Sequence, residues 1–247
     1  MIGDRLLTEL DRRRLMGVPI WHFALRSLFQ PYGLLFLREV VLAAPDRFAC
    51  AFRRARRIWE QGARNGVWRT SPLLERFELL APGYCLKAQC PVGRFSHRCL
   101  YAEGIPLDRL PHSCGVCPLP RLIRTAIQWG ACFYIMTSAA DVARDLFIPN
   151  LRSGYWRTGL FFLCPYSAWP FLLGSLAAGI EAELLTFHTG CCSSYQEFLS
   201  ADRGLKEERT DFAPHFWRRF GRVGESSVGS GFRLQGNVYW PTCCTAD

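Results

Sequence analysis

The sequence has no serine nucleophile elbow, no phosphate-binding glycine loop and no pair of carboxylates at catalytic spacing. It therefore contains no motif of an α/β-hydrolase, a nucleotide-binding enzyme or a two-carboxylate hydrolase. Lysine is almost absent, with two residues against 28 arginines in a chain of 247. A GC-rich genome also produces this bias, so the bias by itself indicates no function.

A convincing secretory signal is also missing. Arg12–Arg14 precede the apolar run Leu15–Leu25, but Pro19 and His22 interrupt this run and Arg26 ends it. A twin-arginine export signal is the alternative, although no small-residue cleavage site follows. With 49% hydrophobic residues the chain can form a core without cross-links, whereas disulfide frameworks belong to small secreted domains. We therefore expect a reducing, cytoplasmic location and cysteines that are not held in disulfides.

Cysteine, in contrast, is abundant, and it is concentrated in one region. Twelve cysteines are present, and five of them fall within 33 residues: Cys85, Cys90, Cys99, Cys114 and Cys117. Cys114 and Cys117 form a C-x-x-C motif, which places two sulfurs on one turn where both can reach one metal centre. The spacing matches neither ferredoxin run nor the C-x3-C-x2-C of radical-SAM enzymes. The motif therefore predicts a metal site without specifying the metal.

Two features favour an iron–sulfur cluster over zinc. Proline follows Cys90, Cys117 and Cys164 directly, as it follows the last cysteine of the bacterial ferredoxin run. The candidate thiolates also outnumber the four ligands of a structural zinc ion. We predict a cluster, with 4Fe–4S favoured, whose metal ligands come from Cys85, Cys90, Cys99, Cys114, Cys117, Cys164 and Cys191, with Cys192 in the same site. The alternative is zinc, held by Cys114, Cys117 and two of Cys85, Cys90 and Cys99.

The hydrophobic pattern predicts an α/β fold: a small parallel sheet with flanking helices, preceded by a cysteine-rich metal-binding loop region and an N-terminal helical segment. Residues 1–80 form the basic helical segment, 81–220 the cysteine-rich α/β domain and 221–247 a flexible tail. Strands are predicted at Ala131–Met136, Leu160–Leu163 and Glu183–Phe187. Helices are predicted to end near Gly130 and to cover Ala139–Phe147, Phe171–Ala178 and Tyr195–Ala201, with Ser138 and Ser194 as N-caps.

Three further cysteines lie just beyond predicted strands. Cys164 follows Leu160–Leu163, while Cys191 and Cys192 follow Glu183–Phe187 and precede a capped helix. In parallel sheets this edge lines the ligand-binding crevice, and a helix N-terminus lowers the pKa of a thiol. These cysteines either complete the cluster or act as redox or nucleophilic thiols; the alternative is that Cys164 is an inert buried residue.

The charge-free run Thr158–Ile180 is 23 residues long, which is enough to cross a bilayer. Prolines and glycines divide it, so we expect a buried strand, a turn that carries Cys164 and a buried helix, with a membrane-embedded segment as the alternative.

The net charge of +9 is concentrated at the N-terminus, where residues 1–69 hold thirteen arginines against six carboxylates. Pro45 can open a helix in which arginines oppose Phe48, Phe52, Ile58 and Trp59. One interpretation is that residues 45–62 make peripheral contact with a membrane or an acidic partner. The favoured interpretation is that the arginines form a solvated face on a helix that packs on the core. Nucleic acid is not favoured as a partner, because no binding motif accompanies the charge.

The cysteine pattern resembles that of a bacterial and archaeal family known as "domain of unknown function one hundred and sixteen", over roughly residues 82–210. Members of that family are similar in having an early cysteine pair, a C-x-x-C that leads into a helix, and later cysteines after strands. The corresponding cysteines here are Cys85, Cys90, Cys99, Cys114, Cys117, Cys164 and either Cys191 or Cys192. The resemblance implies a metal-dependent role with suspected membrane association.

Together these patterns predict an iron–sulfur protein that transfers electrons or sulfur or supports a redox enzyme partner. A zinc-stabilised binding module that docks through its basic N-terminal helices is the alternative, and a metal-free thiol enzyme is a third. The sequence does not decide whether the chain is itself an enzyme.

Overall fold

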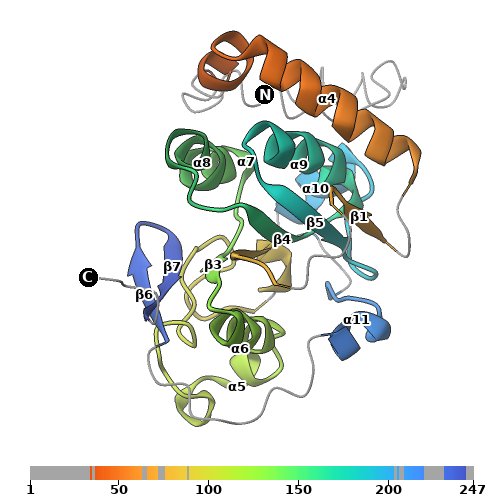
Figure 1. Cartoon of the computed structure of the whole chain (residues 1–247). Helices are drawn as coiled ribbons and strands as arrows, with labels where there is room; N and C mark the ends of the chain where they lie inside the picture. Colours follow the sequence, from red (N-terminus) through yellow and green to blue (C-terminus); the bar gives the residue numbers. More distant parts are fainter. Residues whose placement is uncertain are drawn as a thin grey trace.

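The computed structural model describes residues 34, 37–62, 66–71, 76–87, 89–202, 205, 209–219 and 231–242, which form one α/β fold (Figure 1). Its seven-stranded sheet has the order β1-β5-β4-β2-β3-β7-β6. The four central strands β5, β4, β2 and β3 are parallel. β1 pairs with β5 antiparallel at one edge, and the antiparallel pair β6 and β7 closes the other edge through β3.

The strands are β1 (Val67–Arg69), β2 (Leu79–Pro82), β3 (Cys132–Tyr134), β4 (Thr158–Leu163), β5 (Glu181–Thr186), β6 (Phe232–Gln235) and β7 (Val238–Pro241). The α-helices are α4 (Pro45–Glu60), α5 (His112–Gly115), α6 (Leu119–Trp129), α7 (Ala139–Val142), α8 (Ile148–Ser153), α9 (Pro165–Ala177), α10 (Tyr195–Asp202) and α11 (Pro214–Arg219). The π-helical turns are η1 (Leu37–Leu42) and η4 (Ala143–Phe147), and the 3-10 turns are η2 (Tyr84–Leu86) and η3 (Leu107–Arg109).

The central strands are buried on both faces, which explains their continuous apolar sequences. Helices α4, α8 and α9 lie over one face and α6 and α11 over the other (Figure 1). Each face has its own core: Leu79, Phe161 and Leu184 point to the α9 side, and Leu80, Phe162 and Leu185 to the α6 side. Because β2, β4 and β5 pair in parallel, their C-terminal ends lie at the same end of the sheet.

Several local predictions are confirmed. The three predicted strands correspond to β3, β4 and β5. Helix α6 ends at Gly130, whose φ of 64° places it in the left-handed conformation that glycine adopts readily. The Ser138 hydroxyl accepts a hydrogen bond from the Asp141 N–H at 3.1 Å, and the Ser194 hydroxyl accepts one from the Glu197 N–H at 3.2 Å.

Three predictions about organisation need correction. The predicted parallel sheet is present in the four central strands, but the sheet has seven strands, so it is not small, and both of its edges are antiparallel. The cysteine-rich region does not precede the sheet; it is the connection from β2 to β3. Residues 231–242 are not a flexible tail but form strands β6 and β7. One sheet thus takes strands from all three predicted segments. Residues 1–33 of the predicted N-terminal helical segment lie outside the described residues.

The predicted basic helix is α4, which packs on α9 through the buried Ala51 and Ala55. Pro45 occupies its first turn, as expected. Arg54, on its polar face, forms a bidentate salt bridge with Glu181. Its Nη1 and Nη2 donate to the two carboxylate oxygens at 2.6 and 2.8 Å. Contact with a membrane through this helix stays a prediction.

The run Thr158–Ile180 forms the buried strand β4 and the buried helix α9, with Cys164 at the turn between them. In the part of the chain that the structure describes, none of the helices combines the length and apolar character needed to cross a bilayer.

Arg69→Ala is expected to lower the free energy of unfolding by about 2 kcal/mol, because Glu183 is 1% exposed and would lose its contacts with this guanidinium. Urea denaturation measures the change. The matched control is Arg56→Ala, whose partner Glu60 is exposed and for which we expect less than about 0.5 kcal/mol. Equal losses of stability in the two variants would show that the burial of Glu183 does not make its ion pair with Arg69 more important than an exposed pair.

Candidate metal centre

The connection from β2 to β3 folds around a pocket of about 430 Å³. All five cysteines of the cysteine-rich region line this pocket: Cys85, Cys90, Cys99, Cys114 and Cys117. They come from η2, from the loop that follows it, and from α5 and the turn that joins α5 to α6. The arrangement is therefore consistent with the prediction that the cysteine-rich region folds around one metal site.

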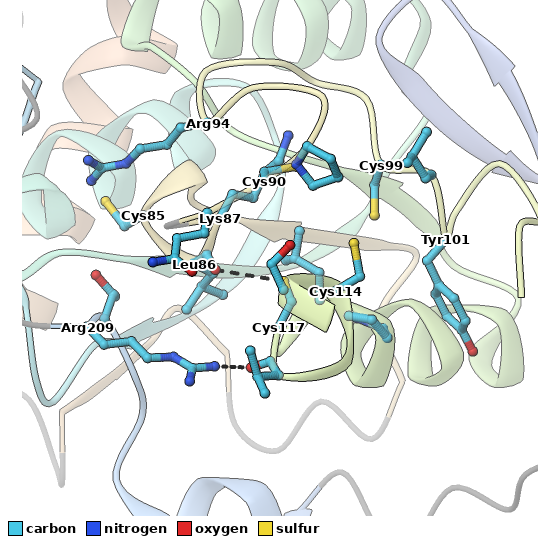
Figure 2. Close-up of a pocket in the computed structure, with 18 residues that line it drawn as sticks. Cys85, Leu86, Lys87, Cys90, Arg94, Cys99, Tyr101, Cys114, Cys117 and Arg209 are labelled. Carbon is cyan, nitrogen blue, oxygen red and sulfur yellow. Dashed lines mark hydrogen bonds between the residues drawn. The ribbon is translucent and has the colours of Figure 1, made fainter. Parts of the chain in front are cut away.

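Four of the five cysteines form one group, which we call the quartet: Cys90, Cys99, Cys114 and Cys117. The thiol of Cys117 lies within electrostatic range of the other three. In Figure 2 the sulfurs of Cys99 and Cys114 point toward one another. Cys85 lies apart from them, on the other side of Lys87. The five pocket cysteines thus divide into the quartet and one separate thiol.

Lys87 lies between the cysteines and is buried, with 1% exposure. Its ammonium donates hydrogen bonds to the carbonyls of Ser96 and Arg98, at 2.6 and 2.8 Å. Burial lowers its pKa, while the neighbouring thiols of Cys90 and Cys99 oppose this shift. Among the described residues, no carboxylate forms an ion pair with Lys87. The nearest groups that can become anionic beside this buried cation are therefore thiols.

Backbone N–H groups point at two of the quartet sulfurs. Cys99 receives hydrogen bonds from Ala102 and Tyr101. Cys117 receives one from Leu119, the first residue of α6, where the N–H groups have no partner inside the helix. Hydrogen bonds of this kind favour the thiolate over the thiol, whereas the Cys117 thiol also donates to the Leu86 carbonyl at 3.8 Å, a contact that favours its protonated form.

Burial acts in the opposite direction on the thiols themselves. It raises the pKa of Cys117 to about 11 and raises the pKa values of Cys99 and Cys114 above their ordinary range. Without a bound metal these cysteines are therefore protonated at neutral pH. A bound cationic centre would reverse this, because metal coordination deprotonates thiols.

A second group of thiols, which we call the trio, consists of Cys85, Cys164 and Cys192. Cys164 is in hydrogen-bonding contact with Cys192 and with Cys85, and both contacts raise its pKa well above the ordinary value. All three residues are buried in the same core, on the α6 face of the sheet. Cys164 and Cys192 do not line the pocket, so the trio extends from Cys85 into the interior.

The remaining cysteines have separate settings. Cys191 is half-buried and does not line the pocket, Cys132 is buried on the α9 side of the sheet, and Cys50 is exposed on α4. No pair among the ten described cysteines is joined in a disulfide. Cys243 and Cys244 lie outside the described residues. The structure therefore does not gather all eight predicted site cysteines around one space.

His97, two residues before Cys99, lies in a polar network. Its Nδ1 is 2.8 Å from the Ile135 carbonyl oxygen, and its Nε2 is 3.1 Å from the Thr137 hydroxyl. His97, Asp141 and Asp145 have ligand atoms close enough to hold one ion. However, the guanidinium of Arg144 bridges both carboxylates, so both are already engaged in a salt-bridge network.

Sequence reasoning missed the cations of the pocket. Arg94 and Arg209 line it with Lys87, and Arg209 donates a hydrogen bond to the Val116 carbonyl. Arg209 comes from a segment more than ninety residues after Val116. A signal for Lys87 was present: it is one of only two lysines, and it stands between Cys85 and Cys90. No sequence pattern indicated that it would be buried.

Comparison of the chain with protein-family models, with curated proteins and with solved structures found no match. The family resemblance of residues 82–210 therefore stays a prediction.

Proposed function

We propose that the chain binds an iron–sulfur cluster in this pocket, with Cys90, Cys99, Cys114 and Cys117 as ligands, and serves as an electron carrier for a redox partner. A cluster bound there would supply one-electron redox chemistry. The observation that carries the proposal is the burial of Lys87 among thiols. An ammonium buried without a carboxylate is costly, and thiolates bound to metal would provide the missing negative charge.

The charges around the pocket support the same assignment. A four-iron cluster with four thiolate ligands carries net negative charge in its common redox states. Lys87, Arg94 and Arg209 surround the pocket with cations, and backbone N–H groups are directed at Cys99 and Cys117. Such cations and hydrogen bonds stabilise the more reduced state and raise the reduction potential.

The quartet sulfurs are not gathered as closely as the ligands of a closed single-ion site. In a tetrahedral zinc site the sulfurs are about 3.8 Å apart, as follows from Zn–S bonds of about 2.3 Å. Within the described part of the chain, no three cysteine sulfurs lie within 4.8 Å of one another. A four-iron cluster holds its thiolates at the corners of a larger core, which suits a pocket of about 430 Å³.

Zinc is the second candidate, and one observation favours it. Cys114 lies in the single turn α5 and Cys117 comes two residues after its end, so the C-x-x-C motif is compact, as in zinc-stabilised modules. In that case the chain is a binding module, and a single ion draws the quartet sulfurs closer together.

Anaerobic purification of the full chain separates the two candidates. A brown protein that absorbs at about 400 nm and contains about four irons and four sulfides per chain supports the cluster. A colourless protein with one zinc per chain supports the zinc module. A protein with neither metal after reconstitution with iron and sulfide, and after addition of zinc, contradicts both.

Metal affinity is expected to rise with pH, by about tenfold per pH unit for each thiol deprotonated on binding. The sign follows from the raised pKa values of Cys99, Cys114 and Cys117, which keep these thiols protonated near neutrality. Lowering the pH adds competing protons and weakens binding. Titration of the metal-free chain with Zn²⁺ against a chelator of known affinity, at about pH 6.5 and 7.5, measures the slope. An affinity independent of pH would exclude these thiols as ligands.

A further inference from the structure

The trio occupies the place in the sheet where α/β proteins bind ligands. The connection that leaves β2 leads to β3 on one side, whereas the connection that leaves β4 leads to β5 on the other side. The C-terminal ends of β2 and β4 therefore flank the crevice at which the strand order reverses. Cys85 follows β2 by three residues and Cys164 follows β4 directly.

Backbone contacts hold the three thiols in this crevice. β2 and β4 are paired up to Pro82 and Phe162, and the Gly83 N–H continues this pairing to the Phe162 carbonyl at 2.9 Å. Cys192 comes from the loop after β5, and its carbonyl accepts a hydrogen bond from the Tyr166 N–H at 3.2 Å, in the first turn of α9. Three neighbouring parallel strands thus bring three distant cysteines to one point.

The trio is buried but is not sealed from the pocket. Cys85 lines the pocket and contacts Cys164, which in turn contacts Cys192. The thiols therefore form a chain from the solvent-connected pocket to the interior. Cys164 is its middle member, and it can form a disulfide with either neighbour, whereas Cys132 on the opposite face of the sheet has no route to it.

We propose that Cys85, Cys164 and Cys192 are a dithiol–disulfide exchange site, in which Cys85 reacts with a small-molecule disulfide in the pocket and Cys164 resolves the product. The site shares the pocket with the quartet through Cys85, but none of its three thiols is a metal ligand proposed there.

The exchange balances without any further reactant. The Cys85 thiolate attacks the small-molecule disulfide, forms a mixed disulfide and releases the first small thiol. Cys164 then attacks the Cys85 sulfur as its proton passes to the departing small thiol, and the Cys85–Cys164 disulfide forms as the second small thiol leaves. Two electrons pass from the two cysteines to the small-molecule sulfurs, and the two cysteine protons end on the two released thiols. Cys192 can then displace Cys85 from Cys164, with no net change in electrons.

The test is carried out on the full chain with glutathione disulfide as the probe, followed by alkylation of remaining thiols and mapping of disulfide-linked peptides by mass spectrometry. We expect Cys164 to be linked to Cys85 or Cys192. Cys50, which is exposed on α4, is the internal control and should give only a mixed disulfide with glutathione. If Cys164 is still fully alkylated when Cys50 has been converted, the proposal is wrong.

Two variants sharpen the result. Cys164→Ser removes the resolving thiol, so the glutathione adduct at Cys85 should change from a minor species to the dominant one, while Cys132→Ser should leave the adduct minor. If Cys164→Ser does not fold, the peptide map of the wild-type chain decides. Cys114→Ser removes a quartet ligand and should leave the disulfide of Cys164 intact. Loss of that disulfide in Cys114→Ser would overturn the independence of the two sites.

Discussion

Cys114→Ser is expected to remove most of the bound metal and, in the metal-loaded chain, to lower the free energy of unfolding by at least about 3 kcal/mol. Serine has nearly the shape of cysteine but is a poor ligand for iron or zinc. Cys114 belongs to the quartet, whose thiols face one pocket and lie within electrostatic range of one another. Because the ion or cluster cross-links the loop after η2, α5 and the turn before α6, binding energy is also folding energy. Metal content and thermal melting of the anaerobically purified variant measure both effects.

Matched controls separate the quartet from other cysteines. Cys50→Ser and Cys132→Ser should keep full metal content, because one residue is exposed on α4 and the other is buried on the opposite face of the sheet. Cys164→Ser should also keep the metal, since Cys164 does not line the pocket. If Cys164→Ser loses the metal and Cys114→Ser does not, the ligands belong to the trio and our assignment is wrong.

Lys87→Met is expected to lower the reduction potential of the metal-loaded chain by about 100 mV. One unit charge at about 6 Å acts with roughly 3 kcal/mol at an effective dielectric constant of about 20, and about 1.4 kcal/mol corresponds to 59 mV in a one-electron couple. Removing a cation disfavours the reduced, more negative state, which sets the sign of the shift. Spectroscopic redox titration measures it.

Lys87→Gln separates charge from structure. Glutamine retains N–H groups that can reach toward the carbonyls of Ser96 and Arg98 but carries no charge. We therefore expect Lys87→Gln to shift the potential nearly as far as Lys87→Met while retaining more of the thermal stability. An unchanged potential in Lys87→Gln would show that Lys87 acts only as a hydrogen-bond donor in the fold.

Local patterns were enough to predict much of the secondary structure. Strands β3, β4 and β5, the end of α6 at Gly130 and the Ser138 cap all depend on residues close in sequence. Strand β2 was not predicted, because its four buried apolar residues precede a cysteine-rich loop and show no distinctive hydrophobic period. β6 and β7 were not predicted because the glycine- and serine-rich segment before them favoured a flexible tail.

The sequence by itself determined that thiols are concentrated in one loop, that Cys114 and Cys117 share a turn, and that strands alternate with helices. Spacing along the chain decides such features. Only the tertiary structure decided that Cys85 lies apart from the quartet and belongs to the same group as Cys164 and Cys192. The same holds for the burial of Lys87 among the thiols. The physical reason is that adjacent parallel strands bring together the residues that follow them, however far apart these are in the sequence.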